Sequence, residues 1–178
     1  CYMLTQHADI TTKLRTQVDT VLGKRLPQFE DLTQLTYPRM VMEETMRLYP
    51  PVFWLPRTTI NEDVIGGYHI KAGQMVATVP LIIHRHPDFW QNPDVFNPEH
   101  FAPDVAKQRH PLAWMPFGAG QRLCIGRDFA MMEGALILAQ VMQQYDFKLI
   151  PNHQPKAALS ATLTAQNGVW VQLAKRKS

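Results

Sequence analysis

The stretch FGAGQRLCIG, residues 117–126, is the most informative part of this chain, because it presents one cysteine in a glycine-rich loop. Gly118 and Gly120 allow the backbone to turn tightly and to approach a bulky partner without a Cβ clash. An apolar helical pattern follows Cys124, so its sulfur is expected beside a helix N-terminus, where free amides and the helix dipole favour a thiolate. Arg122 adds a cation able to hold a carboxylate. A flat, anionic cofactor whose metal accepts sulfur fits these groups.

A lone cysteine is more often an inert, buried residue than a ligand. However, the pattern Phe-x-x-Gly-x-Arg-x-Cys-x-Gly resembles the haem-binding signature of the cytochrome P-450 haem-thiolate monooxygenases. Five fixed positions coincide by chance with odds on the order of one in a million per starting site. The resemblance implies a mainly α fold with small antiparallel β-sheets, the C-terminal, haem-proximal portion of the cytochrome P-450 fold. We therefore expect residues 1–178 to be a single partial domain, without the family's distal helix and N-terminal portion.

The composition is that of a globular protein, with 46% hydrophobic and 19% charged residues. No apolar run reaches the ~18–20 residues that a membrane span requires, and no N-terminal signal pattern is visible. Two cysteines, Cys1 and Cys124, are too few for a disulfide scaffold. A cytoplasmic location, which keeps Cys124 reduced, is the simplest inference. The net charge of +3 is compatible with an acidic protein partner and too weak to indicate nucleic acid.

Two amphipathic helices are expected in the first third of the chain. Apolar residues recur every fourth position from Ile10 to Leu22, which predicts a helix over residues 5–22, and Gly23 can end it. A second helix is expected between residues 34 and 48, because Pro38 is tolerated in a first turn and Tyr49-Pro50-Pro51 ends the pattern.

Short strands are expected on both sides of residues 80–116, which hold seven of the fourteen prolines and cannot be regular throughout. Gly66-Gly67 and Asn167-Gly168 are the turn signals. The expected strands are residues 57–60, 68–70 and 74–79 in one antiparallel sheet, and residues 162–164 and 168–173 in a hairpin.

Glu44 and Arg47 lie three residues apart, one turn of the expected second helix. Alone, such a pair is usually a surface ion pair of little energetic value. Its position resembles the family's Glu-x-x-Arg element, which pairs with a basic residue in the proline-rich loop. That loop reads FNPEHF, residues 96–101, with His100 where the family usually has arginine. Histidine can donate a hydrogen bond to Glu44 but lacks the bidentate fork, so a weaker network is expected.

The resemblance implies a role for several further residues. Cys124 would be the axial ligand of the haem iron, and hence both the catalytic residue and the metal ligand. Arg57, in the sequence LPRT, and Arg122 would bind the two haem propionates. The other expected cofactor contacts are Phe117, Gly120, Ile125, Gly126 and Ala130. By analogy alone, the residues expected to touch substrate are Val52, Phe53, Trp54 and Ala161.

His84 and His86 would share one face of an extended segment, which raises the possibility of a metal pair. No third ligand stands at zinc spacing, so both are interpreted as structural.

The resemblance also implies a reaction. A thiolate ligand favours O–O cleavage at haem iron, and the protein supplies ligation, orientation and a dry pocket. We expect a cytochrome P-450 monooxygenase that inserts one oxygen atom of O₂ into a C–H bond of a lipophilic small molecule, with haem b (iron protoporphyrin IX) as cofactor. Electrons would come from NAD(P)H through a separate, acidic electron-transfer protein of the ferredoxin or flavin-reductase type, because the sequence has no dinucleotide fingerprint.

Three classes of function stay open at this point. The favoured one is a fragment of a monooxygenase, in which case the isolated chain is expected to be inactive. The second is a non-catalytic haem-binding or redox module that is complete as given. The third is a truncated product that acts only as an interaction domain.

Overall fold

The computed structural model describes residues 1–176, which form helices and paired strands connected by long loops. The α-helices are α1 (Tyr2–Gln6), α2 (Ala8–Leu22), α3 (Thr36–Leu48), α4 (Pro80–Ile83), α5 (Pro103–Ala106) and α6 (Arg127–Gln144). The 3-10 helices are η1 (Phe29–Thr33), η2 (Pro98–Phe101), η3 (Pro111–Ala113) and η4 (Gly120–Arg122). The strands are β1 (Leu55–Thr58), β2 (Asp63–Ile65), β3 (Tyr68–Ile70), β4 (Met75–Thr78), β5 (Tyr145–Leu149), β6 (Ala157–Leu159), β7 (Leu163–Ala165) and β8 (Val171–Lys175).

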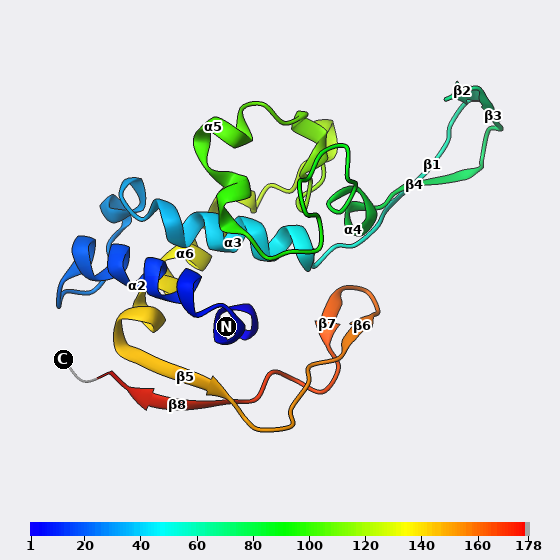
Figure 1. Ribbon diagram of the computed structural model, residues 1–178. Helices are drawn as coiled ribbons and strands as arrows, with labels where there is room; N and C mark the ends of the chain where they lie inside the picture. Colours follow the sequence, from blue (N-terminus) through cyan, green and yellow to red (C-terminus); the bar gives the residue numbers. More distant parts are fainter. Residues whose placement is uncertain (177–178) are drawn as a thin grey trace.

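Helix α3 lies at the centre of the body and packs against α2, α6 and η2 (Figure 1). The predicted apolar face of α2 is confirmed, since its buried residues are Ile10, Leu14, Val18 and Leu22. Gly23 ends α2 with a φ of 57°, as its sequence position indicates. The single helix predicted over residues 5–22 is instead two helices, because the chain leaves helical geometry at His7.

Helices α3 and α6 approach closely, and this contact fixes the two elements that bear the candidate site. A Cβ atom added to Gly134 on α6 would lie 2.5 Å from Cε of Met42 on α3. One face of the C-terminal half of α6, with Ala135, Leu138 and Met142, is buried. The N-terminal end of α6 is therefore held at a fixed distance from the residues of α3.

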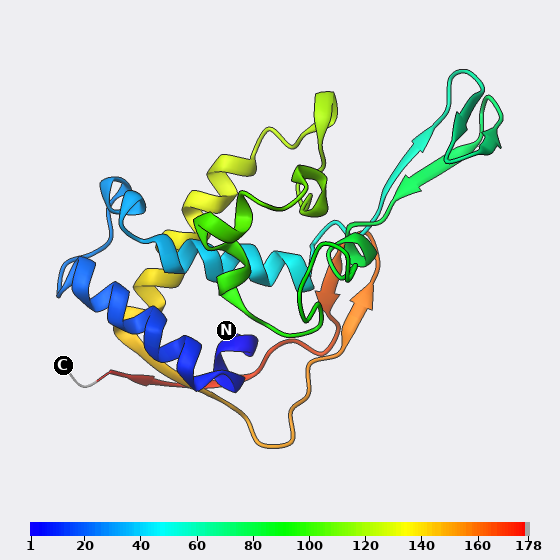
Figure 2. The ribbon, with the colours of Figure 1, turned by 45° about the horizontal axis from the view of Figure 1, so that its top comes forward.

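The prediction of one three-stranded sheet is wrong. Strand β1 pairs with β4, and β2 pairs with β3, as two separate antiparallel ladders. Residues 63–65, for which no strand was expected, pair with β3 because Gly66 and Gly67 adopt φ values of 58° and 85° and close a tight turn. These strands form an arm that projects from the body (Figure 2).

The predicted hairpin at Asn167-Gly168 is also wrong. Strand β8 pairs with β5, and β6 pairs with β7. Gly168 does make a turn, with a φ of 69° and a hydrogen bond from its amide to the Ala165 carbonyl at 3.0 Å. The chain then continues along β5 instead of folding back on β7, because β5 offers a five-residue partner.

The proline-rich residues 80–116 wrap across α3 as short helices and turns (Figure 2). His84 and His86 follow α4 and lie outside any strand, so the extended segment expected there is wrong. Aromatic rings connect this segment to the cysteine loop, with centroid distances of 5.4 Å for Phe101–Trp114 and 6.4 Å for Trp114–Phe117. Within residues 1–176, no helix combines the length and apolar character needed to cross a membrane.

Candidate functional site

The loop that carries Cys124 is built by glycines and closed by one backbone hydrogen bond. Gly118 and Gly120 have φ values of 78° and 64°, which side chains rarely tolerate. The Cys124 amide donates to the Phe117 carbonyl at 3.0 Å. Helix α6 begins three residues later, with Gly126 as its N-cap. The predicted place of Cys124 beside a helix N-terminus is therefore confirmed.

The Cys124 thiol is exposed within an apolar surface. Leu123, Ile125 and Phe129 are large, exposed hydrophobic residues around it. Gly126 and Ala130 lie one turn apart on α6, joined by the Ala130 amide and Gly126 carbonyl at 2.9 Å. A Cβ atom at Gly126 would lie 3.8 Å from the Cys124 sulfur. Small residues beside an exposed thiol leave room for a flat, apolar group against the sulfur, so the residues present fit a haem.

Two exposed guanidinium groups lie on the segments expected to bind propionates. Arg122 ends η4 within the loop, and Arg57 lies on β1. The Arg57 Nη1 atom donates to the Pro56 carbonyl at 2.7 Å. Both segments meet near Gly118, where an added Cβ atom would contact the Arg122 carbonyl at 3.6 Å and the Leu55 side chain at 4.0 Å. The two cations therefore belong to neighbouring parts of the fold.

Glu44, Arg47 and His100 are in contact and buried. Arg47 donates from Nε and Nη2 to the two Glu44 carboxylate oxygens at 2.7 and 2.9 Å. Its remaining donors go to the carbonyls of His84 at 2.8 Å, Pro93 at 2.5 Å and Val95 at 2.9 Å. All five guanidinium N–H groups are thus satisfied. Arg47 thereby holds the proline-rich segment against α3.

His100 completes this network in spite of its shorter side chain. Its Nδ1 lies 3.2 Å from Glu44 Oε1, and its Nε2 lies 2.8 Å from the Gln91 carbonyl. Burial raises the pKa of the Glu44 carboxyl, but hydrogen bonds from Arg47, His100 and the Asn97 amide, with the charge of Arg47, lower it below its ordinary value. Glu44 is therefore an ionised acceptor, and both ring nitrogens of His100 have acceptors. A weaker network was expected because histidine replaces arginine, but both ring nitrogens of His100 have hydrogen-bond partners.

His84 also contacts this network. The sequence had led only to the interpretation that His84 is structural. Its ring is fully buried, with Nδ1 3.2 Å from the Arg47 carbonyl and Nε2 accepting from the Met115 amide at 2.9 Å. Burial lowers the pKa of His84 to about 4, and the charges of Arg47 and Arg85 act in the same direction against its backbone hydrogen bonds. The folded protein therefore holds this ring neutral.

The neutral His84 predicts an acid-labile fold. An unfolded histidine takes up a proton near pH 6.5, whereas folded His84 does so near pH 4. Between these values the unfolded chain binds more protons, so stability is present above pH 6.5 and is lost as the pH falls toward 4. The loss is on the order of 3 kcal/mol.

Urea unfolding at intervals between pH 7 and pH 4.5 measures this loss. The matched control is His84→Gln, which cannot titrate and whose stability should fall less over the same range. Equal pH slopes for the two proteins would contradict the prediction.

The expected substrate residues lie in two segments that meet. Val52 and Trp54 are exposed, and the Phe53 and Trp54 rings stack at 6.5 Å. Ala161 lies in the turn between β6 and β7. The amide of Leu163, in the same hairpin, donates to the Pro51 carbonyl at 2.8 Å. The structure thus places the hairpin of Ala161 beside residues 51–54.

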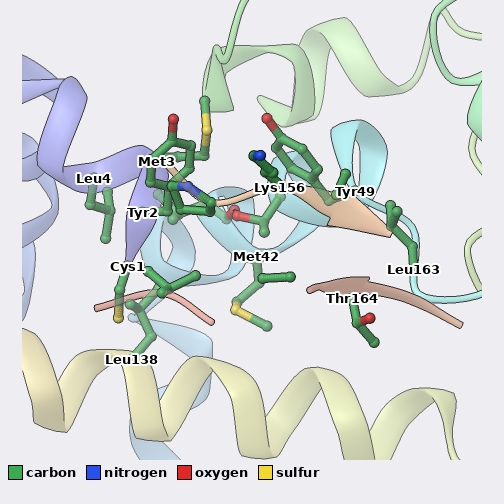
Figure 3. Close-up of a pocket in the computed structure, with 16 residues that line it drawn as sticks. Cys1, Tyr2, Met3, Leu4, Met42, Tyr49, Leu138, Lys156, Leu163 and Thr164 are labelled. Carbon is green, nitrogen blue, oxygen red and sulfur yellow. The ribbon is translucent and has the colours of Figure 1, made fainter. Parts of the chain in front are cut away.

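A cavity of about 460 Å³ lies elsewhere, between α1, α3, α6 and the β6–β7 hairpin (Figure 3). The cavity is lined by Met42, Leu138 and apolar side chains of α1. Tyr49 and Lys156 contribute polar groups. None of the expected site residues lines this cavity. It is therefore separate from the surface around Cys124.

Comparison with known proteins agrees with this geometry. The sequence model described as Cytochrome P450 matches residues 1–171. The chain belongs to the cytochrome P450 family. Cytochrome P450 4V2 from Homo sapiens is 34% identical over 99% of this chain, and thromboxane-A synthase from Mus musculus is 33% identical over 98% of it. The chain spans about a third of those relatives, 34% of each.

The P450 fold is shown independently by solved structures. The crystal structure of the cytochrome P450DA heme domain superposes with a TM-score of 0.93 and 30% identity, covering 99% of this chain and 39% of that one. The predicted fold class, mainly α with small antiparallel sheets, is confirmed. P450 proteins are haem-dependent oxidoreductases of the monooxygenase kind, which use O₂ and electrons from a redox partner.

Some residues around the Glu44 network gave no recognisable sequence signal. Trp90 is almost fully buried, and the guanidinium carbons of Arg109 and Arg47 lie 3.7 and 4.9 Å from its ring centroid. Neither Trp90 nor Arg109 was predicted from the sequence to contact the Glu44 network. Only their arrangement around the Glu44 network relates them to the cysteine loop.

Proposed function

We propose that this chain is the C-terminal, haem-proximal portion of a cytochrome P450 monooxygenase in which Cys124 would ligate the iron of haem b. The observation that carries the proposal is the exposed Cys124 thiol, held beside the N-terminus of α6 by a loop with two left-handed glycines. When bound, the haem supplies oxygen activation at its iron, and one oxygen atom of O₂ enters a C–H bond of the substrate.

The residues of the chain bind and orient that group. The Cys124 sulfur would donate to the iron, with Gly126 and Ala130 as the small residues beside it at the start of α6. Phe117, Gly120 and Ile125 shape the loop beside it. Arg57 and Arg122 neutralise the propionates from two neighbouring segments. The Glu44–Arg47–His100 network lies behind the loop and keeps its supporting segment in place.

The substrate is proposed to be a lipophilic small molecule. Val52, Phe53 and Trp54 offer an apolar and aromatic surface, and Ala161 lies in the hairpin that meets it. Such a surface binds by excluding water. Electrons would come from NAD(P)H through an acidic electron-transfer protein, which the net charge of +3 favours. A cytoplasmic location stays a prediction.

We propose further that the isolated chain does not turn over substrate. The residues around Cys124 leave its thiol on an open surface, so bound haem would meet this chain on one side. Oxygen chemistry requires a site closed to water on the other side as well. The family's distal helix, with its Ala/Gly-Gly-x-x-Thr element, would supply that wall in a longer parent.

Haem binding tests these proposals. The chain, and the chain preceded by whatever coding sequence lies upstream, would each be titrated with hemin, reduced and exposed to carbon monoxide. We expect one haem per extended protein, a thiolate-type difference spectrum, and turnover by the extended protein alone. Stoichiometric thiolate-type binding by the chain, with no distal-helix element upstream, would favour the complete redox module instead. If neither protein gave the thiolate-type spectrum, only the third class of function, an interaction domain, would remain.

A further inference from the structure

His84 bridges the buried ion-pair network and the segment that leads to the cysteine loop. It follows α4 directly, and its own carbonyl accepts from Arg47 Nη1 at 2.8 Å. Its Nδ1 lies 3.2 Å from the Arg47 carbonyl, which requires the proton on Nδ1. Its Nε2 is then free to accept the Met115 amide hydrogen, at 2.9 Å. One side chain therefore contacts both the end of α3 and residue 115.

Met115 is the first residue of the turn on which the cysteine loop closes. Its carbonyl accepts from the Gly118 amide at 3.1 Å, and the Phe117 carbonyl accepts from the Cys124 amide at 3.0 Å. Met115 and the adjoining Pro116 are buried, so this turn cannot shift without disturbing the core. An unbroken series of short contacts runs from Arg47 through His84 and residues 115–118 to Cys124.

We propose that His84 is a positioning residue for Cys124: by accepting the Met115 amide, it fixes the base of the cysteine loop to the Glu44–Arg47–His100 network. The proposal rests on the proposed function in one respect, namely that the sulfur so positioned meets haem iron. The hydrogen-bonded series itself exists without haem.

Two substitutions separate this role from that of a residue that merely fills the core. A glutamine side chain places an amide oxygen near the Nε2 position, where it can still accept from Met115. An asparagine side chain reaches only the Nδ1 position, so it keeps the bond to the Arg47 carbonyl and leaves the Met115 amide unpaired. Both are uncharged amides, and only glutamine preserves the Met115 contact. Glutamine gives up the Nδ1 contact, so its link to Arg47 is the hydrogen bond to the backbone carbonyl of residue 84.

Amide hydrogen exchange, read residue by residue in the haem-free chain, tests the proposal. In His84→Asn, exchange at Met115, Gly118 and Cys124 should be about tenfold faster or more, as expected for one lost buried hydrogen bond. In His84→Gln it should stay within about threefold of the unaltered chain. Equal acceleration in both variants, or none in either, would overturn the positioning role.

The unaltered chain offers a second test, in case His84→Asn does not fold. The Met115 and Cys124 amides should open together, with protection factors that agree within about threefold. Independent opening of the two amides would also overturn the proposal.

The haem-loaded protein distinguishes a failure here from a failure of the proposed function. His84→Asn should lose part of its thiolate-type carbon monoxide spectrum, and His84→Gln should keep it. If the exchange rates respond as expected while no protein, altered or unaltered, gives a thiolate-type spectrum, then the positioning role stands and haem ligation is what fails.

Discussion

In the haem-loaded extended protein, which includes the upstream coding sequence, Cys124→Ser is expected to abolish the thiolate-type spectrum and to lower turnover by at least about a hundredfold. Loss of a residue that merely orients a metal ligand costs 10–100-fold, so loss of the ligand itself should cost more. Serine keeps the shape of the side chain but replaces the sulfur, whose electron donation favours O–O cleavage. The loop should survive, because its closure depends on the Cys124 amide and not on the side chain.

The matched control is Cys1→Ser, which alters the other exposed thiol of the chain. It should leave the spectrum and turnover unchanged. Both variants should unfold within about 0.5 kcal/mol of the unaltered protein, as exposed substitutions usually do. A Cys124→Ser protein with an intact thiolate-type spectrum would show that the sulfur comes from elsewhere, and the proposed function would be wrong.

Arg47→Ala is expected to lower the free energy of unfolding by at least about 3–5 kcal/mol, because it leaves the buried Glu44 carboxylate without its main partner. The side chains of Arg47 and Glu44 are both 0% exposed. The substitution also leaves the carbonyls of His84, Pro93 and Val95 without a donor. A loss of this size is a large part of the 5–15 kcal/mol that stabilises a typical domain.

Two further variants keep this prediction testable if Arg47→Ala does not fold. Arg47→Lys should also be strongly destabilised, because three ammonium donors cannot replace five in a planar fork. Arg39→Ala is the control, since Arg39 pairs with Glu43 on the same helix but has a side chain that is 65% exposed. It should cost about 1 kcal/mol or less. Urea unfolding followed by circular dichroism measures all three, and similar losses for Arg39 and Arg47 would contradict the prediction.

The parts of this structure that follow local rules could be predicted from the sequence. The four-residue spacing of apolar side chains identified the buried face of α2, and Gly118 and Gly120 indicated the tight cysteine loop beside α6. The contact between Glu44 and His100 could be anticipated only through the family resemblance, because nothing in the local sequence distinguishes a buried ion pair from an exposed one.

The parts that depend on distant pairing could not be predicted. Asn167-Gly168 is a turn signal, but it carries no information that β8 has a partner in β5, more than twenty residues earlier. The single helix expected over residues 5–22 is broken at His7, and the apolar repeat could not reveal this because it begins only at Ile10. The hydrogen bonds of His84 were likewise invisible, because a histidine in a polar stretch gives no indication that it is fully buried.

The hydrogen bonds of Arg47 join residues that are far apart in the sequence, and this separation limits the order in which parts of the molecule can fold. The three carbonyl partners of Arg47 lie 37, 46 and 48 residues further on, so a ribosome must add the proline-rich segment as far as Val95 before that cluster can form. Closing loops of this length costs conformational entropy, and contacts between sequence neighbours do not offset that cost beforehand. The support beneath Cys124 therefore forms late in folding, and under the proposed function haem would bind only after it has formed.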